Sequence, residues 1–230
     1  MEKKYILTDE TIEYLGHTLH RIKAVKNFAT ISAGTLGGYI ESEGNLNPIG
    51  DAWVSGDAKV YGDARVYENA WVSDNARVFD NAMVSDSAWV YGDAWVSGDA
   101  KVYGDARVYE NAWVSGDAKV YGDAQVYGDA WVSGDAKVYG DARVSGDAKV
   151  YGDAKVYGDA DYTTVHGFGR YFRTTTFFRC NNGVVRCQCG CFYGSIDEFR
   201  AKVRGTHGNS KYAKEYLMIA DLMELHFKED

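Results

Sequence analysis

The segment GDAWVSGDAKVYGDARVYENAWVS, residues 50–73, shows the six-residue pattern that runs through residues 50–160. Its consensus is GDAxVx, and the register holds without insertion, so that a valine stands at every sixth position from Val54 to Val156, 18 in all. Alanine keeps its own position from Ala52 to Ala160 without exception. A short, fixed period with one invariant apolar site is typical of a β-solenoid, in which each repeat buries its apolar side chain only against neighbouring repeats.

The pattern also predicts the shape of each coil. In Ala-x-Val-x the alanine and valine point to one side of a strand and the two x residues to the other. Gly-Asp or Glu-Asn then turns the chain, because glycine tolerates unusual dihedral angles and Asp or Asn can hydrogen-bond its own backbone. Three strands and three corners make a triangular coil of 18 residues, so the repeats predict about six coils. At ~4.8 Å per coil the prism should be roughly 29 Å tall.

A valine with a small residue four places on, as in Val54 and Ala58, resembles the hexapeptide-repeat, left-handed parallel β-helix family. The opening Leu36-Gly37-Gly38 and the tail segments CGCFYG (189–194) and YAKEYL (212–217) resemble hexapeptide-repeat proteins of unknown role encoded by bacteriophages and prophages. The resemblance implies an all-β solenoid with side-by-side packing of prisms in a homotrimer. It brings no established activity with it.

The chain divides into three parts at the ends of the repeat. Residues 1–45 are predicted to form an N-terminal β cap with a turn at Leu15-Gly16, residues 46–160 the β-helix, and residues 161–230 a C-terminal cap. An irregular first coil is expected to begin near Ile40. Capping elements are needed because the ends of a solenoid expose unpaired strand edges.

The C-terminal cap is predicted to be a small ββαα unit. Residues 174–180 and 184–187 have the composition of strands, and Asn181-Asn182-Gly183 between them is a hairpin signal. Ser195 and Glu198 form a capping box that opens a short helix over residues 196–204. A longer amphipathic helix should follow Ser210.

Charge and hydropathy exclude several classes of protein. Residues 50–160 carry 10 basic and 19 acidic side chains, so the prism is strongly acidic and accounts for the net charge of −8. An acidic prism argues against non-specific binding to nucleic acid, which depends on clustered Lys and Arg. The N-terminus is charged and no run of 18 apolar residues occurs, so we expect no membrane association and a cytoplasmic location in a bacterial host cell.

Residues 18 apart should stack on the same face, which sorts the variable positions into ladders. All six tryptophans fall on two faces, with Trp53, Trp71 and Trp89 on one and Trp95, Trp113 and Trp131 on the other. The third face carries lysines beside a column of tyrosines: Tyr103, Tyr121, Tyr139 and Tyr157. Contiguous exposed apolar patches usually mark interfaces. We therefore favour a subunit interface, and two alternatives stay open: mutual stacking along the surface, and a platform for a sugar or nucleobase.

The residues expected of hexapeptide-type enzymes are missing from the prism. Acyltransferases of the resembled family use a histidine beside a coil and a loop that leaves it, and the carbonic anhydrases use three prism histidines. Here all five histidines lie outside residues 50–160, and no loop interrupts the repeat. The sequence favours a non-enzymatic protein. The alternative is an acyltransferase with its site between subunits, served by a cap histidine such as His166.

The C-terminal cap carries the remaining candidate residues. Its four cysteines are favoured as free thiols packed under the helices, and the alternatives are redox or disulfide chemistry and a zinc ion held with His207: Cys180, Cys187, Cys189 and Cys191. Four arginines are candidates for a small anion site: Arg170, Arg173, Arg179 and Arg186. No cofactor is predicted.

These observations lead to one functional expectation. The sequence predicts an oligomeric binding or scaffold protein, phage or prophage encoded, that acts in host interaction. Inhibition of a bacterial defence factor and capture of a nucleotide-like signal both fit this role, with a host protein or a small ligand as the partner.

Overall fold

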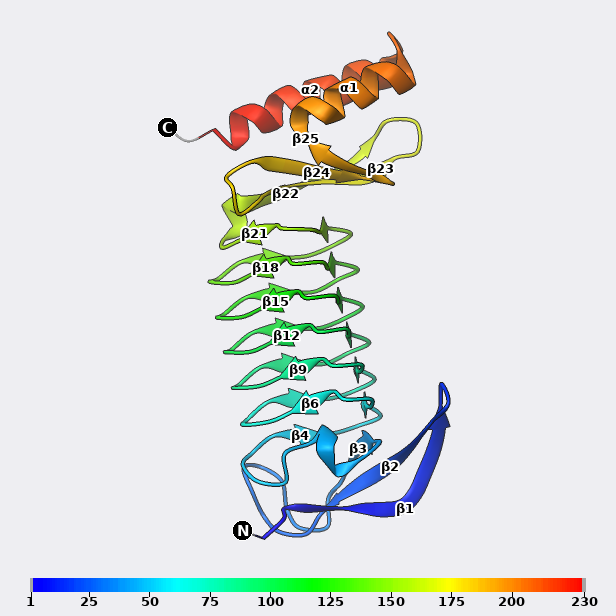
Figure 1. Ribbon diagram of the computed structural model, residues 1–230, viewed down its shortest axis with the longest axis vertical. Helices are drawn as coiled ribbons and strands as arrows, with labels where there is room; N and C mark the ends of the chain where they lie inside the picture. Colours follow the sequence, from blue (N-terminus) through cyan, green and yellow to red (C-terminus); the bar gives the residue numbers. More distant parts are fainter. Residues whose placement is uncertain (1, 229–230) are drawn as a thin grey trace.

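The computed structural model describes residues 2–228 and shows a triangular prism with a cap at each end (Figure 1). Eighteen two-residue strands form the three faces of the prism. The first face contains β4 (Trp53–Val54), β7 (Trp71–Val72), β10 (Trp89–Val90), β13 (Arg107–Val108), β16 (Gln125–Val126) and β19 (Arg143–Val144). The second contains β5 (Lys59–Val60), β8 (Arg77–Val78), β11 (Trp95–Val96), β14 (Trp113–Val114), β17 (Trp131–Val132) and β20 (Lys149–Val150). The third contains β6 (Arg65–Val66), β9 (Met83–Val84), β12 (Lys101–Val102), β15 (Lys119–Val120), β18 (Lys137–Val138) and β21 (Lys155–Val156).

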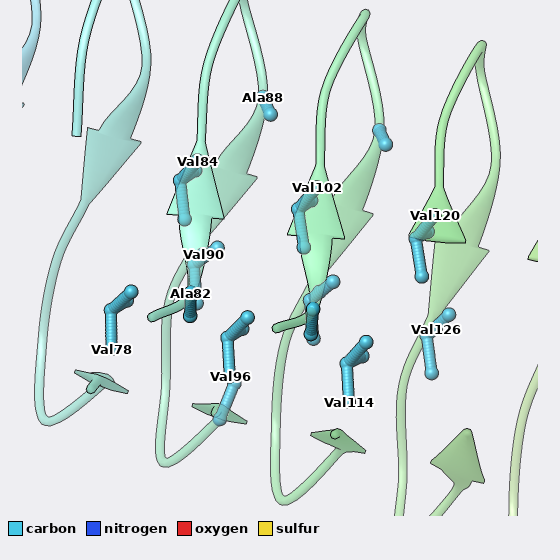
Figure 2. Packing of buried hydrophobic residues seen from close by; sticks show 14 of the residues in the cluster. Val78, Ala82, Val84, Ala88, Val90, Val96, Val102, Val114, Val120 and Val126 are labelled. Carbon is cyan, nitrogen blue, oxygen red and sulfur yellow. The ribbon is translucent and has the colours of Figure 1, made fainter. Parts of the chain in front are cut away.

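The register between coils is the predicted one. Every ladder is parallel and joins residues 18 apart, as Val96 joins Val78 on one side and Val114 on the other. The alanines from Ala52 to Ala154 and all the valines of the repeat have no exposed surface. Figure 2 shows the consequence, with Val84, Val102 and Val120 in one file of the core. Burying each valine stabilises the stack by about 1.5–3 kcal/mol, so the core is one continuous column.

The corners of the coils require a left-handed backbone, which glycine supplies at most of them. Five corners carry an acidic residue at positive φ instead, as at Asp74 with φ 60°. Each of these carboxylates accepts a hydrogen bond from the backbone amide 18 residues later, and Asp74 Oδ2 lies 3.0 Å from the amide nitrogen of Gly92. The others are Glu68, Asp80, Asp86 and Glu110. A bond to the next coil therefore offsets the strain of a non-glycine corner.

The N-terminal cap continues the second face. It contains β1 (Tyr5–Tyr14), β2 (His17–Ala24), β3 (Leu36–Ile40) and the short 3-10 helix η1 (Glu43–Asn45). β1 and β2 are antiparallel, and β3 pairs in parallel with β5, so that the second face belongs to a nine-stranded sheet. Ile40 lies over Val60 and Leu46 over Val66, which confirms the irregular first coil and brings the solenoid to about seven turns rather than six.

The C-terminal cap has two more strands than the sequence predicted. A four-stranded antiparallel sheet closes the last coil: β22 (Tyr162–Phe168), β23 (Arg173–Arg179), β24 (Val185–Cys189) and β25 (Phe192–Ser195). The hairpin at Asn181-Asn182-Gly183 is confirmed, as β23 and β24 pair across it. The two outer strands escaped prediction because β22 follows the 3-10 helix η2 (Asp159–Asp161) without a turn signal and β25 has only four residues.

Two helices lie on the side of this sheet that faces away from the prism (Figure 1). Ser195 caps α1 (Ile196–His207) in the predicted box with Glu198, and Ser210 caps α2 (Lys211–His226). Their buried faces form a second core with the sheet, around Phe177, Phe199 and Met223. Neither helix, nor any other within residues 2–228, is long and apolar enough to cross a membrane.

Candidate functional site

An exposed indole ladder runs along the second face of the prism. Trp95 and Trp113 stack with ring centroids 4.7 Å apart and planes 8° from parallel, and Trp131 meets Trp113 edge-on at 5.3 Å. Arg77 lies over the free face of Trp95 and Lys149 over Trp131. The ring faces are therefore covered within the chain, while Trp113 and Trp131 still expose 39% and 37% of their surface. The ladder offers ring edges to a partner rather than a free stacking plane.

The first face does not carry the three-tryptophan surface that the sequence predicted. Trp53 is only 1% exposed, because Phe28 packs on it at 5.3 Å and Tyr5 at 6.5 Å. It anchors the N-terminal cap and is unavailable to a ligand or another subunit. Trp71 and Trp89 stack at 6.1 Å, and Trp89 is half exposed. The prediction is corrected for Trp53, since its burial depends on residues far away in the sequence.

The tyrosine column beside the third face is present as predicted. Tyr103, Tyr121 and Tyr139 stack at 4.9 and 5.0 Å with nearly parallel rings, and Tyr157 ends the column edge-on. Burial in the stack raises the pKa of Tyr103 and Tyr121 above the ordinary value, which keeps both hydroxyls neutral. A second column follows the first face and was missed by the sequence analysis: Tyr91, Tyr109 and Tyr127. Their spacing of 18 residues was the signal for it.

A groove of mixed charge follows the lysines of the third face. Lys101, Lys119 and Lys137 alternate along it with a row of acidic corners: Asp99, Asp117, Asp135 and Asp153. Because each cation has an acidic residue beside it, the groove lacks the clustered positive charge that phosphate backbones require.

The four arginines proposed as one anion site do not converge. Arg179 faces the last coil, where its Nε lies 3.4 Å from Asp161 and its Nη2 donates to the carbonyl of Phe227. Arg186 lies 3.8 Å from Asp153. Only Arg170 and Arg173, both near the turn between β22 and β23, lie together. The prediction is wrong for the other two because acidic groups at the end of the prism attract them.

The cysteines divide into two pairs. Cys180 and Cys187 are buried, and desolvation raises the pKa of both thiols, that of Cys180 to about 12. Cys189 and Cys191 line a pocket of the cap together with His207. Within residues 2–228 no group of three or more His, Cys, Asp or Glu side chains is placed to hold a metal ion. The geometry thus gives the zinc alternative no ligand set.

A hydrogen-bonded chain orients His166 at the edge of the cap. The hydroxyl of Thr174 donates to Asp147 Oδ2 at 3.3 Å, and His166 Nδ1 lies 3.0 Å from the same hydroxyl oxygen. The contact at Nδ1 fixes the imidazole by one edge, and the side chain of His166 is exposed to solvent.

The stacked parallel coils, the invariant apolar core and the two caps define a β-solenoid repeat protein. Four segments of the prism match the model of the YdcK beta-solenoid repeat, over residues 58–74, 76–92, 100–116 and 136–152. The chain is similar to that repeat family over these segments, all of which lie within the coils. A comparison with curated proteins gives no match.

Proposed function

We propose that the protein is a non-enzymatic, oligomeric binding or scaffold protein whose prisms pack side by side. The ladder of Trp95, Trp113 and Trp131 is the observation that supports this proposal. Contiguous exposed apolar surface of this kind usually marks an interface. Tryptophan is also enriched at the centre of protein interfaces, where one indole can bury ~150–250 Å².

The way the indoles are stacked favours a protein partner over a flat ligand. Their faces are occupied by one another and by Arg77 and Lys149, so a sugar or base has no open ring face on which to stack. Serines follow each of the three tryptophans two residues later, and such small side chains leave room for a neighbouring surface to interdigitate. A homotrimer is the assembly that the resemblance to hexapeptide-repeat proteins supports.

Light scattering coupled to size exclusion tests the proposal. The wild-type chain of 25.5 kDa should elute at three times its mass, and Trp113→Glu should elute as a monomer. Gln125→Glu introduces the same charge on the first face and should remain trimeric. Circular dichroism checks that each variant is folded. A monomeric wild type, or a folded Trp113→Glu trimer, would contradict the proposal.

We extend the proposal to a role in host interaction in the bacterial cytoplasm, supported by the resemblance to phage and prophage proteins. In this role the caps or free faces engage a host defence factor or a nucleotide-like signal. Native mass spectrometry of protein purified from bacterial cells tests this extension, because a bound nucleotide or host protein adds a defined mass. If the protein shows only the mass of the chain itself, or of its oligomer, both after purification and in the cell extract, the extension is contradicted.

Acyl transfer between subunits is a second candidate, and the oriented imidazole of His166 favours it. In such a reaction Nε2 would take the proton of an acceptor amine or hydroxyl as that group attacks a thioester, and the thiol would leave. An acyl-CoA hydrolysis and transfer assay tests the idea. His166→Ala should abolish turnover, whereas His226→Ala, at the end of α2, should leave it unchanged. Equal turnover by wild type and His166→Ala would exclude this function.

A further inference from the structure

A pocket of about 170 Å³ opens in the C-terminal cap, away from the prism faces. It lies between the turn that joins β22 to β23, the turn that joins β24 to β25, and the C-terminal half of α1. For comparison, an apolar cavity of about 150 Å³ accommodates one benzene ring. The pocket is therefore of the size that suits a single ring with a small substituent.

The floor of the pocket is aromatic. Phe199 from α1 lies 5.6 Å from the ring of Phe192 and 5.6 Å from that of Tyr216 on α2. Desolvation raises the pKa of Tyr216 to about 12, so its hydroxyl stays neutral. Val203 adds an aliphatic wall. Such a floor favours the apolar body of a ligand, because most of a small ligand's affinity comes from buried apolar surface.

The rim of the pocket is basic. Arg170, Arg173 and Lys202 line it, and no Asp or Glu does, although the protein has a net charge of −8. None of these three side chains has a carboxylate partner within residues 2–228. Arg200, also on α1, is paired, because its guanidinium contacts three carboxylates: Asp197, Asp221 and Glu224. On the pocket side of the same helix, Lys202 has no such partner among the described residues.

Tyr171 holds the two arginines at the mouth. The guanidinium of Arg173 lies 5.0 Å from the centre of this ring and that of Arg170 lies 5.5 Å from it. The next residue, Phe172, has a positive φ of 51° and exposes 66% of its surface. A bulky residue in that conformation is strained. The turn therefore presents two aromatic rings and two cations beside the opening.

We infer that this cap pocket binds a small anion that carries one aromatic ring, as an aromatic phosphate or carboxylate does. The ring packs on Phe192, Phe199 and Tyr216. The anionic group accepts hydrogen bonds from Arg173, Arg170 and Lys202, whose charges the chain itself leaves unpaired. Charge-assisted hydrogen bonds of this type contribute about 1.5–3 kcal/mol each. The inference is independent of prism association, since the pocket lies in the cap.

Isothermal titration calorimetry of the full chain with phenyl phosphate tests this inference. Benzoate presents a carboxylate in place of the phosphate, inorganic phosphate lacks the ring, and phenol lacks the charge. We expect one site per chain for phenyl phosphate or benzoate, at least ~10-fold tighter than for inorganic phosphate or phenol. The stronger of the two anions identifies which group the arginines prefer.

Variants locate the site. Arg173→Ala should weaken binding at least ~10-fold, and so should Lys202→Ala, which leaves the stacking on Tyr171 intact. Arg204→Ala is the matched control, because it removes an exposed cation from the same helix outside the pocket. Three results would overturn the inference: no binding of either phenyl phosphate or benzoate at millimolar concentration, equally tight binding of inorganic phosphate, or an equal loss in Arg204→Ala.

Discussion

Replacing Trp53 by alanine should loosen the packing of the N-terminal cap on the prism. The indole is 1% exposed and lies between the first coil and the rings of Phe28 and Tyr5. Gly37 approaches it so closely that an added Cβ would lie 2.7 Å from Cζ2 of Trp53. Trp53 is the largest fully buried side chain where the cap meets the first coil, and its removal leaves a cavity between them, although β3 stays paired with β5.

The expected cost follows from burial. A fully buried tryptophan replaced by alanine destabilises a protein by about 3–5 kcal/mol, of which part is the cavity. Trp131 provides the control, because residues 128–144 repeat residues 50–66 letter for letter. In the single chain it is 37% exposed, so water can fill the space that its removal leaves. With no cavity to create and a third of the surface already in water, Trp131→Ala should cost only about 1–2 kcal/mol.

Hydrogen exchange resolved by residue is the suitable assay, since a solenoid unfolds from its ends as well as globally. In Trp53→Ala the amides of β1 and β2 should exchange at least ~100-fold faster than in wild type, while those of β14 to β18 change little. In Trp131→Ala the N-terminal cap should keep its wild-type protection. The reasoning is wrong if Trp53→Ala accelerates exchange in β1 and β2 less than ~10-fold, or if Trp131→Ala does so equally.

Three further predictions concern the backbone and the buried thiols. Asp74→Ala should lower stability by about 1–2 kcal/mol in urea denaturation, because it loses the bond to Gly92 and keeps a strained φ, whereas Asp74→Gly should be close to neutral. Gly37→Ala should cost about 1–3 kcal/mol by overpacking, since its Cβ would lie 2.5 Å from Ile22 Cγ1; Gly205→Ala, whose Cβ meets nothing within 4 Å, should not destabilise. The free energy of unfolding should fall as the pH rises above 9.0. In the unfolded chain the thiols ionise there, whereas in the folded protein Cys180, whose pKa is raised to about 12, and Cys187 stay protonated. Urea midpoints at several pH values check this. In Cys180→Ala the midpoint should decline less steeply at alkaline pH, and an unchanged decline would assign the effect to tyrosines.

Much of the architecture could be predicted because its interactions repeat at a fixed distance along the chain. The valine column, the hairpin at residues 181–183 and the box of Ser195 with Glu198 each depend on neighbours at known spacing. The candidate sites were less predictable. Arg173 and Lys202 meet only because the β22–β23 turn folds back onto α1, and Arg179 leaves the group because Asp161 lies at the end of the last coil. No local pattern encodes either contact.

Two identical stretches of this chain show which features follow from the sequence and which depend on the tertiary structure. Residues 50–73 and 92–115 are identical over 24 positions, and both form the same strands and corners, so sequence alone determined the coil, the core and the register. The copies are offset by 42 residues, which is two coils and one further face. Trp53 therefore faces the N-terminal cap and is buried, while Trp95 in the second copy stacks on Trp113 along the exposed ladder. Only the tertiary structure decided this difference, because each hexad bonds to the coil beside it in the same way but is covered by whichever distant segment folds against its face.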